Sequence, residues 1–223
     1  MKLNKNLLSL IALGAATGVA PAVTVISNVS DAEATSTAGV GALGNGSILA
    51  GAYYGAGPGV VPVFAFQLPT LGAGETFSTA TITLFLNGIS GTPAFNGDIV
   101  GLTRTSASSA VIGADFAGAG TMLHDNFFTS ASATGSSTSN DFTGWLNTQY
   151  AGGANAGNFV FIKVDAEGTA GVGSFQGYNV DSANNGTAAN HPALDYTTVT
   201  VPEPSSTALL GLGGLALILR RRK

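Results

Sequence analysis

TATITLFLN, residues 79–87, has the most regular hydrophobic pattern in this chain. Large aliphatic side chains stand at every second position from Ile82 to Leu86, with threonines and Phe85 between them. Successive side chains of a β-strand point to opposite faces, so this alternation predicts a strand with one apolar and one largely polar face. Antiparallel sheets that cover a core on one side have this signature.

Outward from this strand, further short segments have comparable patterns and are separated by turn-rich stretches. The predicted strands are residues 47–54, 60–68, 98–104, 158–164, 174–180 and 193–201, and residues 121–129 form either a strand or an irregular edge. Residues 129–140 are rich in Ser and Thr and predict a loop, and residues 141–150 predict one or two helical turns. We therefore predict an all-β fold, an antiparallel, jelly-roll-like β-sandwich over residues 47–200.

The composition supports this architecture and excludes several kinds of site. The 223 residues include 32 glycines, as expected for many tight turns, and no cysteine. Disulfides, thiolate zinc sites and cysteine nucleophiles are therefore excluded. A domain of about 165 residues buries about 70% of its unfolded surface without cross-links. No cofactor is expected.

The N-terminus has the pattern of a secretory signal peptide. Lys2 and Lys5 precede an apolar stretch at residues 7–19, and two small-x-small cleavage sites follow, ending at Ala22 and at Ala34. Because Asp31 and Glu33 are the first acidic residues, we predict cleavage by signal peptidase after Ala34, with Ala22 as the alternative. Residues 1–34 are then a signal peptide that includes a helix, and residues 35–46 a flexible linker.

The C-terminus has a second targeting pattern. Pro202, Glu203 and Pro204 precede small residues, the apolar run 209–219 and a basic end of Arg220, Arg221, Arg222 and Lys223. A helix over residues 205–219 would be roughly 22 Å long, shorter than a hydrocarbon core of about 30 Å. Terminal cations favour the cytoplasmic side of a membrane. This pattern predicts a short, marginal transmembrane helix with a cytoplasmic stop.

This arrangement resembles the PEP-CTERM sorting signal, in which Pro202, Glu203 and Pro204 match the motif. The resemblance implies that an exosortase, a membrane-embedded transpeptidase-like protease, reads residues 201–223. It also implies an exported protein of a Gram-negative bacterium that makes extracellular polysaccharide. Such a chain is held in the inner membrane by its C-terminal helix before processing and then reaches the cell surface or the extracellular matrix.

The charges between the two targeting segments exclude one class of partner. Between residues 35 and 200, Arg104 and Lys163 are the only cations against nine acids, which gives a formal charge of −7. Nucleic-acid binding requires clustered Lys and Arg and is therefore not expected. The negative charge also disfavours binding of anionic polysaccharides unless a divalent cation bridges the protein and the polymer. Neutral glycans are compatible with this charge.

The exported domain also resembles the DNRLRE-type β-sandwich family over roughly residues 47–200. Residues 63–68, 71–75 and 78–86 are similar to the opening of those domains, and later segments at 142–146, 158–164, 177–183 and 192–196 are similar to its later strands. The resemblance implies a sandwich of an exported or cell-surface protein. We take from it the architecture alone.

No catalytic constellation is expected. His124 lies beside Asp125, but no serine has nucleophile-elbow spacing, and His191 precedes a proline as a turn residue does. Calcium is weighed at Asp181 with Asn184 and Asn185, or at Asp165 with Glu167, but neither set has EF-hand spacing. We predict a protein that is not an enzyme and has no resident metal.

Aromatic residues supply the remaining candidate contacts. Tyr54 follows Tyr53, so one of the two must face outward in a strand, and Trp145 is the only tryptophan. Tyr54 and Trp145 are the candidate glycan contacts, against a role in core packing. Two functions follow: a non-catalytic surface or matrix protein associated with exopolysaccharide, or a specific carbohydrate-binding module, with or without calcium.

Overall fold

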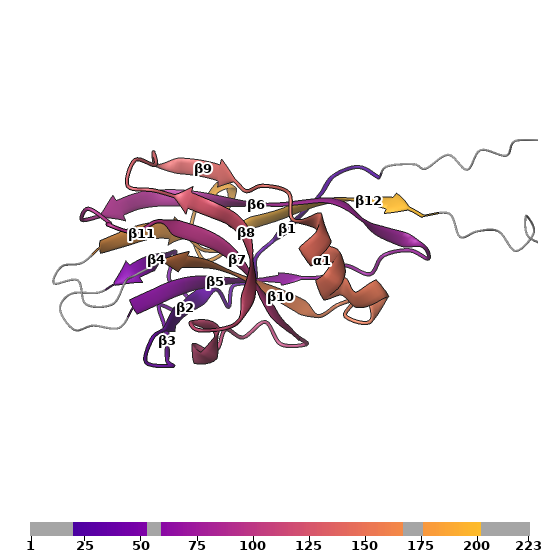
Figure 1. Cartoon of the computed structure of the whole chain (residues 1–223), viewed down its shortest axis with the longest axis horizontal. Coiled ribbons are helices and arrows are strands. Elements are labelled where there is room, and N and C mark those ends of the chain that lie inside the picture. Colours follow the sequence, from indigo (N-terminus) through magenta and orange to yellow (C-terminus); the bar gives the residue numbers. More distant parts are fainter. Residues whose placement is uncertain (1–19, 53–58, 167–175, 202–223) are drawn as a thin grey trace, which may run out of the picture.

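The computed structural model of this chain describes residues 20–52, 59–166 and 176–201, and strands dominate these residues (Figure 1). One α-helix, α1 (Thr143–Tyr150), and short 3₁₀ turns, including η1 (Gly113–Asp115), connect them. The strands are β1 (Val23–Ile26), β2 (Ala32–Thr35), β3 (Val40–Gly41), β4 (Ser47–Ala52), β5 (Gly59–Gln67), β6 (Glu75–Ser90), β7 (Gly97–Ser106), β8 (Gly120–Phe128), β9 (Gly135–Thr138), β10 (Phe159–Ala166), β11 (Gln176–Asp181) and β12 (Ala193–Thr200).

The strands form one curled antiparallel sheet. Its main path runs β1-β12-β6-β11-β4-β5-β10-β7-β8, while β2 pairs with β3 and β5, and β9 pairs with the outer edge of β6. The prediction of an all-β, antiparallel fold is confirmed. The expected two separate sheets of a jelly-roll-like sandwich are instead one continuous sheet that folds over on itself, because β11 and β4 connect its two halves.

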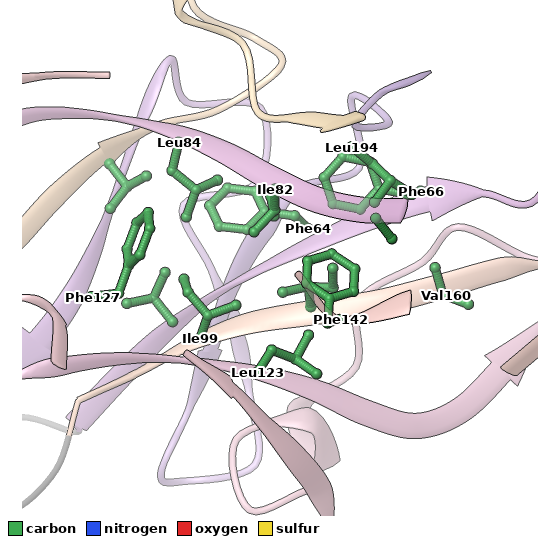
Figure 2. Close-up of a cluster of buried hydrophobic side chains, with 14 of the residues drawn as sticks. Phe64, Phe66, Ile82, Leu84, Ile99, Leu123, Phe127, Phe142, Val160 and Leu194 are labelled. Atoms are coloured by element: carbon green, nitrogen blue, oxygen red, sulfur yellow. The ribbon is translucent and has the colours of Figure 1, made fainter. Parts of the chain in front are cut away.

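The core fills the space between the two halves of the curled sheet. Figure 2 shows Ile82, Leu84 and Leu194 on one side of this space and Ile99, Leu123 and Val160 on the other. The alternation of residues 79–87 explains this arrangement, since every second residue of β6 from Ala80 to Leu86 is buried and those between are not.

A second, smaller hydrophobic cluster lies on the opposite face of β5. Phe64 and Phe66 face the main core, whereas Val61, Val63 and Ala65 face this second cluster with Phe161 of β10. Both faces of β5 are therefore buried, which accounts for its nearly uninterrupted apolar sequence. The second cluster also contains Ala32, Ala34, Leu102 and Val111.

The structure differs from the expected boundaries at the N-terminal side. Residues 20–34, assigned to a signal peptide, include β1 and most of β2, and Ala34 is fully buried between β3 and β5. Residues 35–46, expected to be a flexible linker, contain the last residue of β2, the turn of the β2–β3 hairpin and β3. The Ser/Thr-rich residues 129–140 contain β9. The sequences of β2 and β9 are small or polar, and these strands pair with distant β5 and β6. Strand β1 was included in the expected signal peptide, and β3 has only two residues.

Helix α1 closes one end of the core and carries Trp145. The Trp145 side chain is only 8% exposed and lies directly over Gly101 of β7. A methyl group at Gly101 would stand 2.4 Å from the Cε2 atom of the indole ring. The sequence therefore places a glycine where the helix approaches the sheet most closely.

We expect the Gly101→Ala substitution to lower the free energy of unfolding by about 1–3 kcal/mol, because the rigid buried ring cannot move aside. Urea unfolding followed by Trp145 fluorescence measures the change. Gly88→Ala on β6 is the matched control, since nothing lies within 4 Å of its added methyl group. Equal stability of the two variants would contradict the proposed clash.

Candidate functional site: the terminal strands and the hydroxyl face

The two ends of the described chain lie together. Strand β1 pairs antiparallel with β12, from Val23 opposite Tyr196 to Ile26 opposite Ala193. Beyond this ladder, the Ala20 amide donates to the Thr198 carbonyl at 3.0 Å, and the Val201 amide donates to the Gly74 carbonyl at 2.8 Å. The chain therefore enters and leaves the domain at the same end (Figure 1).

Strands β1, β12, β6 and β9 present a polar outer face, which we call the hydroxyl face. Register places Thr24, Asp195 and Thr81 side by side across three of these strands. Thr83 lies opposite Thr138 of β9 in the same way. The hydroxyl face consists of Thr24, Thr79, Thr81, Thr83, Ser136, Thr138, Asp195 and Thr197.

Hydrogen bonds hold the side chains of the hydroxyl face in rows. The Thr79 and Thr197 hydroxyl oxygens are 2.7 Å apart, and those of Thr83 and Thr138 are 2.9 Å apart. A β-bulge leaves Ser78 without an opposite residue on β12, and its hydroxyl also reaches Thr197 at 2.7 Å. Cross-strand pairing thus fixes rows of hydroxyl groups with one carboxylate, and register places Phe85 and the exposed Ile26 on the same face.

Two carboxylates are buried beside the N-terminal strands. Asp31 is fully buried and accepts hydrogen bonds from the Ser27 hydroxyl at 2.5 Å, the Ala183 amide at 3.1 Å and the Ala65 amide at 3.3 Å. Burial raises the pKa of Asp31 to about 7, although these hydrogen bonds oppose the shift. Glu33 is also buried and accepts a hydrogen bond from the Leu49 amide at 2.6 Å.

Both cations of the described residues serve the fold. The Arg104 guanidinium makes a two-point ion pair with Asp115 at 2.5 Å and lies over the Phe161 ring. The Lys163 ammonium donates to the Phe116 carbonyl at 2.8 Å and pairs with Asp165 at 2.9 Å. Each therefore holds the loop around η1 against the sheet, and neither is arranged to bind a phosphate or a carboxylate ligand.

The two histidines lie in separate parts of the fold, and each contacts a backbone group. The His124 Nδ1 atom accepts a hydrogen bond from the Asn140 amide at 2.8 Å, and the His191 Nε2 atom lies 2.7 Å from the Asn185 carbonyl oxygen. Asp125, the neighbour of His124, instead accepts from the Asn126 side chain. In the described residues, neither histidine is hydrogen-bonded to a serine or to a carboxylate, as a catalytic triad requires.

The loop residues Asp181, Asn184 and Asn185, weighed for calcium, form hydrogen bonds that connect their loop to other parts of the fold. Asp181 is buried and accepts from the amide groups of Asn87 and Asn190, both at 2.9 Å. Asn184 donates to the Val29 carbonyl, and Asn185 donates to the Gly46 carbonyl. No group of three or more metal-ligating His, Asp or Glu side chains occurs in residues 20–52, 59–166 and 176–201, and Glu167 lies outside them.

The aromatic candidates for glycan contact have different outcomes. Trp145 is buried against Gly101 and Phe142, so in this structure its ring is a core residue and offers no stacking face. Tyr54 lies outside the described residues. Other tyrosines also pack inward: Tyr178 donates to the Phe95 carbonyl, and the Tyr150 hydroxyl accepts from the Leu71 amide. The hydroxyl face was not predicted from the sequence, although the alternating threonines of residues 79–83 indicate it.

The comparison with known proteins identifies the C-terminal segment. Residues 200–223 match the PEP-CTERM protein-sorting motif, directly after β12. This motif indicates a protein that exosortase-type machinery processes and sorts to the cell exterior. No curated protein matches the chain.

The described residues contain no helix long and apolar enough to cross a bilayer. The predicted signal-peptide helix within residues 1–19 and the predicted transmembrane helix within residues 202–223 both lie outside them, as do Pro202, Glu203, Pro204 and Arg220 to Lys223.

We expect Asp31→Asn to flatten the pH dependence of stability between about pH 4 and pH 7. The raised pKa means that the folded protein binds a proton in this range more tightly than the unfolded chain, whose Asp pKa is about 3.9. The free energy of unfolding of the natural protein should therefore fall as pH rises through this window, by a few kcal/mol more than in the variant.

Urea unfolding at several pH values measures this effect. Asp195→Asn is the control, because it removes an acid of the hydroxyl face and leaves Asp31 in place. Parallel pH profiles for the natural protein and the Asp31→Asn variant would contradict the expectation.

Proposed function

We propose that this protein is an exported, non-catalytic component of the cell surface or extracellular matrix, which carries a folded β-domain into exopolysaccharide. The observation that carries the proposal is the sorting motif at residues 200–223, joined without a spacer to the last strand. Because Val201 is still hydrogen-bonded to Gly74, the Pro202–Pro204 motif begins where the domain ends.

The proposed route uses both ends of the chain. Signal peptidase and the export machinery act on the N-terminal segment, and the C-terminal apolar run holds the chain in the inner membrane. Arg220 to Lys223 stop it on the cytoplasmic side. An exosortase-type protease then removes the tail near Pro202–Pro204, and the domain moves to the surface of a Gram-negative cell.

A role without catalysis agrees with the chemistry of the described residues. One ring nitrogen of each histidine, Nδ1 of His124 and Nε2 of His191, contacts a backbone group. The buried acids Asp31 and Asp181 are each held by several donors. Such groups stabilise a fold and are poorly placed to act as general acid or base on a substrate.

The hydroxyl face favours a second, more specific function as a binding module for neutral glycans. Its hydroxyl groups can both donate and accept, as sugar hydroxyls do, and its rows are held in place before a ligand arrives. Arg104 and Lys163 are both away from this face and already paired. A neutral polymer therefore fits better than an acidic one.

Replacing Glu203 with alanine should abolish sorting, because Pro202-Glu203-Pro204 loses its only charged group. The full-length variant should keep Lys223 at its C-terminus and remain in the inner membrane of a host that has an exosortase. Intact-mass spectrometry and cell fractionation measure both outcomes. Glu75→Ala, a change of the same type opposite Thr200, should be trimmed normally. Normal trimming of the Glu203→Ala protein would contradict the assignment.

For the glycan-binding function, we expect saturable binding of at least one neutral polysaccharide in affinity electrophoresis. The double variant Thr79→Ala, Thr81→Ala should bind roughly tenfold more weakly, since two hydrogen bonds of about 0.7 kcal/mol each are lost. Thr103→Ala, Thr148→Ala on β7 and α1 is the matched control. The Tyr54→Ala variant tests the remaining aromatic candidate. Equal binding by both double variants would remove the hydroxyl face from this function.

A further inference from the structure

We propose that signal peptidase cleaves between Ala22 and Val23, so that the mature protein begins with β1. The inference rests on the proposed export of the chain and identifies its processing site. Water hydrolyses the Ala22–Val23 peptide bond: the Ala22 carbonyl carbon gains the hydroxyl group as a carboxylate, and the Val23 nitrogen leaves as the new terminal amine.

The first argument is strand pairing. Cleavage after Ala34 would remove all of β1 and three of the four residues of β2. The edge of β5 that faces β2 would lose its partner at residues 61–63, where β2 supplies Ala34, Glu33 and Ala32. An unpaired row of backbone groups would then line this edge of β5.

The second argument is burial. Ala32 and Ala34 are fully buried in the second cluster beside Val61, Val63 and Phe161. Without β2, this apolar group would have an open side. A segment that is discarded during export has no reason to complete the core of the domain that is exported.

The third argument is the set of buried polar bonds. Asp31 accepts from the Ala65 and Ala183 amides, and Glu33 accepts from the Leu49 amide. Ser27 and Asn28 add backbone bonds to Pro192 and Ala65. Loss of residues 23–34 would leave these donors and acceptors without partners in the interior, which is costly.

The two small-x-small sites differ in what their cleavage leaves behind. Ala20-Pro21-Ala22 precedes β1 and lies outside every strand, and Pro21 and Ala22 are exposed. Ala22 also lies three residues after the apolar stretch that ends at Val19. Cleavage there keeps every strand and forfeits one described backbone bond, that of the Ala20 amide. The first acidic residues, Asp31 and Glu33, are therefore core residues of the mature domain.

Intact-mass spectrometry of the full-length gene product, purified from the exterior of an exosortase-containing host, tests this site. We expect an N-terminus at Val23. An N-terminus at Thr35 or at any other residue would overturn the cleavage site. The C-terminal mass from the same spectrum reports sorting separately: a trimmed C-terminus with Thr35 first would refute only the cleavage site. A chain intact at both ends and retained inside the cell would refute export as well.

A matched pair of variants gives a second readout. Ala22→Glu places a charged side chain where signal peptidase requires a small residue, so the unprocessed precursor should accumulate. Leu43→Glu introduces the same side chain at an exposed position beyond both candidate sites and should be processed normally. Normal processing of the Ala22→Glu protein, or a precursor in both variants, would overturn the proposal.

Discussion

The burial of both faces of β5 is the constraint on which the rest of the structure depends. One face supplies Phe64 and Phe66 to the main core, and the other needs a separate cover. Residues of the η1 loop and of β2 pack on this second face, and β2 also pairs with the edge of β5 that would otherwise be unpaired. A central strand of this kind cannot be completed by its sequence neighbours alone, so residues more than twenty positions away become structural.

Much of the sheet could be predicted from sequence because its strands carry their own pattern. The alternation in residues 79–87, and the apolar run of β5, correctly indicated β6 and β5. The helix at residues 141–150 was also recognisable as α1. Strands β2 and β9 were missed because their Thr, Ser, Ala and Glu residues gain their strand conformation from β5 and β6, elsewhere in the chain. Strand β3 has only two residues, and β1 lies within the segment assigned to the signal peptide. The apolar and small residues before Thr35 also satisfied a targeting pattern equally well.

The candidate site was only partly predictable for a related reason. The C-terminal motif is a local string and needs no fold to be recognised, so it matched directly at residues 200–223. The role of Trp145 in the core depends on its contact with Gly101 of β7, which no local sequence pattern reveals. The hydroxyl face is likewise a property of register: its threonines belong to strands far apart in sequence and meet only through β12 and β6 pairing.

The use of both cations inside the fold has a consequence for survival outside the cell. Trypsin-like proteases cut after Lys or Arg, and residues 20–201 offer them only Lys163 and Arg104. Lys163 is buried, and Arg104 is held in place by its ion pair with Asp115 and its contact with the Phe161 ring. Cutting at either residue requires the chain to open locally first. Once its basic tail has been removed, such a domain is a poor substrate for this class of digestive enzyme, a useful property for a protein exposed to its surroundings.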